Sequence, residues 1–336
     1  MTLAPEESER LQVWLAANVG TDAAAPLVID VISGGASNLT LGVRVGDRHV
    51  VVRRPPIGHF LPTAHDMGRE YTVYRAVHGT AVPVPHALAH CADEGVIGAP
   101  FYVMQYLDGI VPHDATVLAG TTAETNARLS ERFVEILVAI HALDVDAVGL
   151  GDFAKREGYL ARQVARWSDQ WERSKVADTP VIDDLGRLLR QRMPQQLETT
   201  LVHGDYRLGN VMLDRTDAAV VLAVLDWEMA TLGDPRSDLA YTLLYWSTKD
   251  RPLVHPSQAI ADLPGFPTAG DLVTRYEHVS GRSCEHLDFY IALAAYKLTI
   301  IGEGARARAI RTGRPDPFAG VERPLPEWAL SLLSNH

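Results

Sequence analysis

Apolar and β-branched residues alternate with polar ones in several short runs near the start of the chain. This period-2 alternation is typical of half-buried strands, and Gly46-Asp47 between two of the runs is a turn signal. The pattern predicts five strands, at 27–33, 39–45, 49–53, 86–91 and 101–106. Helical spacing of apolar residues predicts one helix at about 6–18, before the first strand, and another at about 66–78, between the third and fourth.

After residue 106 the apolar positions recur mainly at helical spacing. In the first long segment Phe133, Ile136, Leu137 and Ile140 form one apolar stripe. Helices are predicted at 122–143, 159–173, 180–192, 239–246, 268–279, 286–303 and 328–333. We therefore expect an α+β chain of two domains, a small antiparallel sheet domain at 1–106 and a larger, mainly helical domain at 107–336.

Three oxygen-bearing side chains surround one predicted β-hairpin. Apolar runs at 211–213 and 218–225 form its strands, Asp205 and Asn210 lie before it, and Asp226 ends it. Such convergence suits Mg²⁺, a hard cation that takes oxygen ligands from protein, phosphate and water. Phosphoryl transfer also needs a carboxylate that orients the attacking hydroxyl and accepts its proton. The segment thus predicts a phosphotransferase.

The motif His203-Gly-Asp-Tyr-Arg-Leu-Gly-Asn210, with Asp226 further along, resembles the signature of the aminoglycoside phosphotransferase and choline kinase branch of the protein-kinase-like superfamily. Together with Asp226-Trp-Glu228 and Leu232-Gly-Asp-Pro235, it is most similar to the kinase-like domain that some proteins carry fused to acyl-CoA dehydrogenases. The resemblance covers most of the chain and implies a two-lobed protein-kinase-like fold with ATP and Mg²⁺ as cofactors.

The same resemblance implies roles for individual residues of the segment. Asp205 is expected to be the catalytic base, and Asn210 and Asp226 are expected to hold Mg²⁺. Asp238, at the start of the following helix, is expected to brace the catalytic loop. His141 stands alone on an apolar helix, and we assign it no chemistry.

The nucleotide-binding residues are expected in the sheet domain. The small-residue turn at 33–38 has backbone amides that can approach phosphates, although Gly-Gly by itself also suits a plain hairpin turn. Its candidate residues are Gly34, Gly35, Ser37 and Asn38. By resemblance, Arg53 replaces the lysine that holds the α- and β-phosphates in most relatives, with Glu70 as its partner. Gln105, Tyr106 and Leu107 resemble the hinge that binds adenine, or are plain packing.

Composition narrows the class of protein. The 31 basic and 42 acidic residues give a net charge of −11, which offers no electrostatic footprint for nucleic acid. Two cysteines do not make a disulfide framework, and no apolar stretch reaches the length of a membrane span. We expect a cytoplasmic enzyme without nucleic-acid or membrane partners.

These observations predict an ATP- and Mg²⁺-dependent kinase that phosphorylates the hydroxyl of a small molecule. The link to acyl-CoA dehydrogenases favours a hydroxyacyl-CoA or hydroxy acid as acceptor. Acceptors of the aminoglycoside, choline or homoserine type are the alternative, and Arg53 in place of lysine also leaves open a pseudokinase that binds nucleotide without turnover. Arginines in two regions either bind anionic groups of the acceptor or lie on solvated faces. They are Arg162 and Arg166, which are expected to be exposed together with Trp167, and Arg306, Arg308, Arg311 and Arg314.

Overall fold

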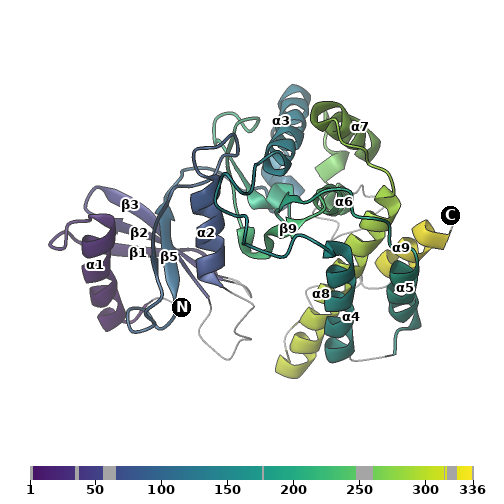
Figure 1. Cartoon of the computed structure of the whole chain (residues 1–336). Helices are drawn as coiled ribbons and strands as arrows, with labels where there is room; N and C mark the ends of the chain where they lie inside the picture. Colours follow the sequence, from purple (N-terminus) through teal and green to yellow (C-terminus); the bar gives the residue numbers. More distant parts are fainter. Residues whose placement is uncertain are drawn as a thin grey trace. The chain divides into compact units, whose positions relative to one another are not determined.

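The computed structural model describes residues 3–34, 38–55, 66–175, 178–246, 260–313, 315 and 324–334 (Figure 1). The chain has a mixed α+β fold and divides into two compact units. The sheet unit comprises Met1–Gly109 and Leu222–Glu228, and the helical unit comprises Ile110–Val221 and Met229–His336. The short segment Leu222–Glu228 therefore belongs with the sheet unit, whereas a single division after residue 106 would assign it to the helical domain.

The sheet unit is built on five antiparallel strands in the order β1-β2-β3-β5-β4. Five strands and two helices were predicted here, and both predictions are confirmed. Their bounds are α1 Pro5–Val19, β1 Leu27–Gly34, β2 Leu39–Val45, β3 Arg48–Arg54, α2 Met67–Val77, β4 Ala87–Cys91 and β5 Phe101–Gln105.

Strand periodicity decides which residues of the sheet meet which helix. Val50 and Val52 of β3 share an apolar cluster with Leu11 and Leu15 of α1. Arg53, one residue further along, points to the opposite face because successive side chains of a strand alternate. Helix α2 lies against β4 and β5 there. The same alternation that buries the valines thus delivers one cation to the α2 side of the sheet.

The helical unit contains seven α-helices within the described residues. These are α3 Ala123–His141, α4 Tyr159–Ser174, α5 Pro180–Gln191, α6 Arg236–Tyr245, α7 Ala269–Ser280, α8 Leu287–Thr312 and α9 Pro324–Ser334. Strand β6 (Thr200–Val202) pairs antiparallel with β9 (Thr231–Gly233), and β7 (Val211–Leu213) forms the predicted hairpin with β8 (Val221–Val224). The described residues also include the short 3₁₀ helices η1 Ala115–Leu118, η2 Leu208–Asn210, η3 Trp227–Met229 and η5 Ile260–Asp262.

Two elements differ from the predictions made from the sequence. Helix α8 continues through Gly302 and Gly304 to Thr312, beyond the predicted end at residue 303. An isolated glycine costs only about 1 kcal/mol in a helix, and both glycines are buried, so burial of the helix offsets that cost. Strand β9 was not predicted, because a strand of three residues is too short to show an alternation of polar and apolar positions. In the part of the chain that the structure describes, no helix could span a membrane.

Packing of β9 depends on the absence of a side chain at Gly233. A Cβ atom there would lie 2.6 Å from ring carbons of the buried Tyr159, at the start of α4. We therefore predict that Gly233→Ala lowers the free energy of unfolding by about 1–3 kcal/mol, as is usual for overpacking. Urea unfolding monitored by circular dichroism measures this. Gly120→Ala is the control, because no atom lies within 4 Å of its added methyl group, and equal effects of the two changes would contradict the packing argument.

Candidate active site

A buried ion-pair cluster forms on the α2 face of the sheet unit. Arg53 Nε lies 3.3 Å from Glu70 Oε2, and Arg53 Nη2 donates a hydrogen bond to Asp226 Oδ1. The Glu70 side chain is fully buried, while Asp226 retains 28% of its exposure. The predicted pairing of Arg53 with Glu70 is present, and Asp226 joins it because Leu222–Glu228 packs with this unit.

Asp226 adopts a backbone conformation that is uncommon for a residue other than glycine. Its φ is 66°, in the left-handed region that aspartate and asparagine tolerate better than most side chains. The strain is offset by a hydrogen bond of 3.1 Å that the Asp226 N–H donates to Tyr74 Oη. Tyr74 is buried on α2. The conformation ends β8 abruptly and fixes where the carboxylate points.

Burial and charge act against each other in this cluster. Burial raises the pKa of Glu70 to about 7, and Arg53 opposes that rise. Burial by itself would lower the pKa of Arg53, but Glu70 and Asp226 together hold it above its usual value. Arg53 therefore remains a cation at any physiological pH.

Two of the other residues expected to bind nucleotide, Gly34 and Asn38, belong to the same unit. Gly34 ends β1 opposite Leu39 in the register, and Gly35 and Ser37 lie outside the described residues. Asn38 is buried, and its Nδ2 donates to Glu228 Oε2 at 3.1 Å. Asn38 thus connects the turn after β1 to the segment that carries Asp226.

The predicted hinge follows the exposed end of β5. The Gln105 N–H donates to His86 O at 2.8 Å, which extends the pairing of β5 with the residue before β4. The Tyr106 ring stacks on the His49 ring, with 3.5 Å between centroids. Leu107 follows as a half-buried residue. Packing therefore already engages the Tyr106 ring.

In the helical unit, Asp205 and Asn210 are held against each other. Asn210 Nδ2 donates to the Asp205 backbone oxygen at 2.8 Å and to Asp205 Oδ2 at 2.7 Å. The other carboxylate oxygen, Asp205 Oδ1, accepts no hydrogen bond from the described residues and lies 3.4 Å from Arg207 Nε. The two oxygens of Asp205 therefore differ: Oδ2 accepts from Asn210, and Oδ1 is buried beside Arg207.

A buried carboxylate holds the backbone of the loop that carries Asp205. Asp238 accepts the backbone N–H of His203 at 2.6 Å and that of Gly204 at 2.7 Å. His141 Nε2 lies 3.3 Å from the same carboxylate, and His141 Nδ1 lies 2.8 Å from Tyr276 Oη. His141 is therefore a structural residue with both ring nitrogens engaged, and Asp238 has the bracing geometry expected of it.

Burial by itself would raise the pKa of Asp238, but the hydrogen bond from His141 and the nearby His203 and Gly204 N–H hold it below its usual value. The loop also requires glycine at 204. The φ of Gly204 is +84°, and a Cβ there would lie 2.6 Å from Met229 O. The negative charge of Asp238 and the absence of a side chain at Gly204 together fix the backbone conformation that leads to Asp205.

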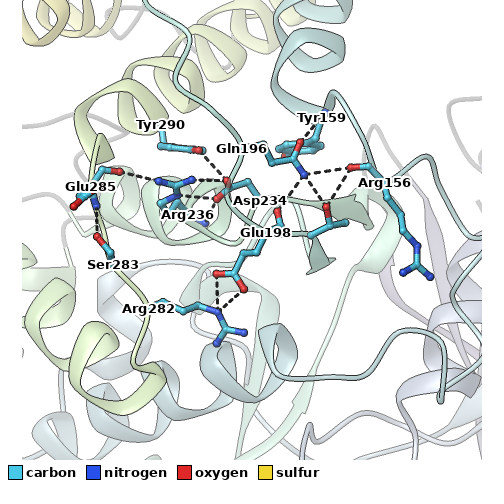
Figure 2. A network of polar contacts seen from close by, with 11 residues as sticks. Arg156, Tyr159, Gln196, Glu198, Asp234, Arg236, Arg282, Ser283, Glu285 and Tyr290 are labelled. Atoms are coloured by element: carbon cyan, nitrogen blue, oxygen red, sulfur yellow. Dashed lines mark hydrogen bonds and ion pairs between the residues drawn. The ribbon is translucent and has the colours of Figure 1, made fainter.

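A second polar network holds the start of α6, from which Asp238 projects (Figure 2). Arg236 donates two hydrogen bonds to the Asp234 carboxylate, one of 2.9 Å from Nε and one of 2.7 Å from Nη2. Tyr290 Oη donates to Asp234 at 2.9 Å, and Arg236 Nη1 donates to Glu285 O at 3.0 Å. The Gly-Asp-Pro-Arg turn is thereby tied to α8. The role of Arg236 was not predicted, because nothing local indicates its distant partners.

Two further cations next to Asp205 were not singled out from the sequence. Arg207 lies with its Cζ 5.1 Å from the Tyr245 ring centroid. Lys297, on α8, donates to Gly204 O, and its Nζ lies 4.3 Å from the Tyr241 ring centroid. Arg207 is only two positions after Asp205, which was the one available signal, whereas Lys297 is brought in by tertiary packing alone.

The arginines that were considered as acceptor ligands are more peripheral. Arg166 is exposed and stacks on Trp167, which was expected to be exposed but is buried in the core of the helical unit. Arg162 bonds backbone oxygens before its own helix, such as Lys155 O. Arg308 and Arg311 are exposed on the last turns of α8, and Arg306 pairs with Glu303 at 3.5 Å; Arg314 lies outside the described residues.

Fold and site together define a kinase-like phosphotransferase. A sequence profile of the phosphotransferase enzyme family matches residues 28–272. The chain belongs to this family, and its motifs place it with the kinase-like domains found in acyl-CoA dehydrogenase family members 10 and 11.

The curated relatives include acyl-CoA dehydrogenase family member 10 of Mus musculus, 34% identical over 90% of this chain and 28% of the relative. Acyl-CoA dehydrogenase family member 11 of Homo sapiens is 31% identical over 97% of this chain and 43% of the relative. The chain thus spans less than half the length of these relatives.

Solved structures give the same fold. A Ralstonia eutropha JMP134 protein, provisionally named an aminoglycoside phosphotransferase, is 31% identical with a TM-score of 0.82, over 97% of this chain and 98% of the other. The aminoglycoside phosphotransferase APH(4)-Ia in complex with ADP and hygromycin B is 17% identical with a TM-score of 0.59, over 97% of each chain. The latter similarity concerns the fold alone.

Removing the charge of Asp238 should loosen the loop that carries Asp205. Because hydrogen bonds to a buried charged group each contribute about 1.5–3 kcal/mol, we predict that Asp238→Asn lowers the free energy of unfolding at pH 7 by at least that amount. The folded-state pKa of Asp238 is depressed. The contribution of the Asp238 charge to the free energy of unfolding is therefore complete above the unfolded-state pKa of about 3.9, and it is lost as the pH falls through the folded-state pKa.

Urea titrations of both proteins from pH 7 to pH 3 measure this difference. The gap between wild type and Asp238→Asn should be constant down to about pH 5 and shrink in more acidic solution. Asp184→Asn, which changes an exposed carboxylate on α5, should have little effect at any pH. A gap that widens on acidification would contradict the assigned charge state.

Proposed function

We propose that this chain transfers the γ-phosphate of ATP, with Mg²⁺, to the hydroxyl of a small hydroxyacyl-CoA or hydroxy acid. The observation that carries the proposal is how firmly Asp205 is held. Asn210 holds its Oδ2, Asp238 binds the backbone N–H groups of His203 and Gly204, and Oδ1 is buried beside Arg207. A base for an incoming hydroxyl needs a carboxylate that the surrounding structure keeps in position.

In the proposed reaction the acceptor hydroxyl donates to the Asp205 carboxylate. The acceptor oxygen forms a bond to the γ-phosphorus while the bond from that phosphorus to the bridging oxygen of ADP breaks. Asp205 takes the hydroxyl proton, and ADP leaves with the bonding electrons. Positioning and charge stabilisation supply most of the catalysis in such transfers.

On the nucleotide side, we assign the α- and β-phosphates to Arg53. Its guanidinium contacts Glu70 and Asp226 through different nitrogens, which a single lysine ammonium could not do in the same geometry. Glu70 keeps the cation in place from the buried end. We assign backbone contacts with the phosphates to Gly34, Gly35, Ser37 and Asn38, and the adenine to Gln105, Tyr106 and Leu107.

For Mg²⁺ we propose Asn210 and Asp226. Both offer oxygen, the donor that this cation prefers. Asn210 uses its amide nitrogen on Asp205, which leaves the amide oxygen as its ligand atom. Arg53 contacts Asp226 through Oδ1, and Oδ2 is the corresponding candidate. When bound, the ion would neutralise charge on the phosphate oxygens.

The acceptor class rests on the relatives and on local charge. The relatives of this chain are named acyl-CoA dehydrogenase family members, so a partner reaction on acyl-CoA compounds is proposed. Arg207 and Lys297 surround the Asp205 loop with positive charge, which suits an anionic acyl compound and disfavours a polycationic aminoglycoside.

Cys91 and Cys284 are buried thiols, consistent with a reducing compartment, for which we propose the cytoplasm.

The test of the base is Asp205→Asn. We predict that this change keeps the affinity for an ATP analogue and lowers turnover by about 10²–10⁴-fold, the range of general-base catalysis. Coupled measurement of ADP formation with 3-hydroxybutyryl-CoA and 3-hydroxybutyrate gives the turnover, and calorimetry gives the affinity. An Asp205→Asn variant as active as wild type would remove the proposed base.

The test of the metal ligand is Asp226→Asn, because asparagine also tolerates the left-handed backbone there. We expect Mg²⁺ to strengthen binding of an ATP analogue to the wild type, and to lose most of that effect in the variant. Calorimetry with and without Mg²⁺ measures both, with Asp184→Asn as the control. Nucleotide binding with no turnover across a broad acceptor panel would instead indicate a pseudokinase.

A further inference from the structure

Lys297, on α8, holds the peptide group that joins Gly204 to Asp205. The oxygen of this group is Gly204 O, which accepts a hydrogen bond from Lys297 Nζ. Its N–H belongs to Asp205 and donates to His203 Nδ1 at 3.2 Å. Because a peptide group is planar, one contact at each edge fixes the orientation of the whole group. The peptide plane that leads into the proposed base is therefore held on both sides.

The preceding peptide group is held by a different element. The N–H of Gly204 donates to Asp238 Oδ1 at 2.7 Å, from the first turn of α6. Between the two peptide groups lies the Cα atom of Gly204, where rotation is less hindered than at a residue with a Cβ atom. Rotation there would move Gly204 O and turn the Asp205 side chain with it. The bond to Asp238 does not prevent this rotation, and the bond from Lys297 opposes it.

Two aromatic rings place the ammonium group of Lys297. Its Nζ lies 4.3 Å from the ring centroid of Tyr241 on α6 and 5.9 Å from that of Trp167 on α4. Both helices pack against α8, and both aromatic residues are buried. A cation within about 6 Å of an aromatic ring face is attracted to it. Three helices thus fix the position from which Lys297 donates to Gly204 O.

We propose that Lys297 is a positioning residue for Asp205: through the Gly204 carbonyl it fixes the direction in which the Asp205 carboxylate points. This inference rests on the proposed function and adds a residue that supports the base of that site. A hydrogen bond from an ammonium group is stronger than one between neutral groups, which suits this role. Lys297 acts through the backbone and makes no contact with the acceptor in this assignment.

The test uses two variants of Lys297 in the full chain. Lys297→Met removes the ammonium group and keeps a side chain of similar length and helix propensity, so α8 should still form. Lys297→Arg keeps a cation that can donate to the carbonyl oxygen and lie over an aromatic ring. Lys175→Met is the matched control, because it makes the same change at an exposed lysine whose partner is Glu172.

Three measurements are made on each protein. Coupled measurement of ADP formation with 3-hydroxybutyryl-CoA and 3-hydroxybutyrate gives kcat and the acceptor KM. Calorimetry with a non-hydrolysable ATP analogue gives its Kd, and the stoichiometry corrects kcat for any unfolded fraction. Hydrogen exchange followed by mass spectrometry, on peptides that contain residues 203–205, reports how firmly the loop is held without depending on any acceptor.

We expect Lys297→Met to lower kcat by about 10- to 100-fold, since a displacement of about 1 Å can cost this much. The acceptor KM and the Kd of the ATP analogue should change by less than about threefold, because the groups that bind both compounds remain. Exchange at residues 203–205 should become about 10-fold faster, the effect of losing one charge-assisted hydrogen bond. Lys297→Arg should recover most of the lost kcat, and Lys175→Met should change none of these quantities.

Several results would overturn the proposal. A raised acceptor KM with unchanged kcat would mean that Lys297 binds the acceptor, and faster exchange throughout the helical unit would mean that it supports the fold in general. Unchanged exchange at residues 203–205, or an unchanged kcat, would also remove the positioning role. In each of these cases the phosphotransferase assignment stands. If the wild type phosphorylates no hydroxyl acceptor, the proposed function itself fails, and the role of Lys297 fails with it.

Discussion

Two backbone N–H groups bound to one buried carboxylate fix the loop that carries Asp205, the proposed base. His203 and Gly204 donate to Asp238, which is itself immobilised by His141 and by the first turn of α6. Burying a charge is costly unless it is hydrogen-bonded, and Asp238 is bonded on several sides. The arrangement therefore holds only when α3, α6 and the His-Gly-Asp loop are all in place, which makes the position of Asp205 a property of the whole helical unit.

The sheet unit also depends on a buried charge, which here is positive. Arg53 is a buried cation that two carboxylates hold, one on α2 and one on the segment after β8. A lysine would place one compact charge there, whereas the arginine fork engages Glu70 and Asp226 at once. The replacement is thus compatible with a charged, ordered site, and it ties Asp226 to the sheet before any ligand binds.

Both units place their functional groups at positions where the backbone is restricted. Gly204 has a positive φ against Met229, Asp226 has one without being glycine, and Gly209 leaves space for Arg207. Such positions have low tolerance for substitution because the surrounding structure fixes them.

The sequence by itself determined the five strands of the sheet and most helices, because local periodicity encodes them. Motif spacing also singled out Asp205, Asn210, Asp226 and Asp238 as candidate site residues, and their roles stay a prediction. The resemblance to the family also indicated Glu70 as the partner of Arg53, and the two side chains are in contact. Tertiary structure alone decided that Leu222–Glu228 packs with the sheet unit, that α8 continues through two glycines, and that Trp167 is buried. It also brought Arg236, Lys297 and Tyr245 to their partners, because these contacts join residues that are distant in sequence, and no local pattern records which distant side chain fills a given space.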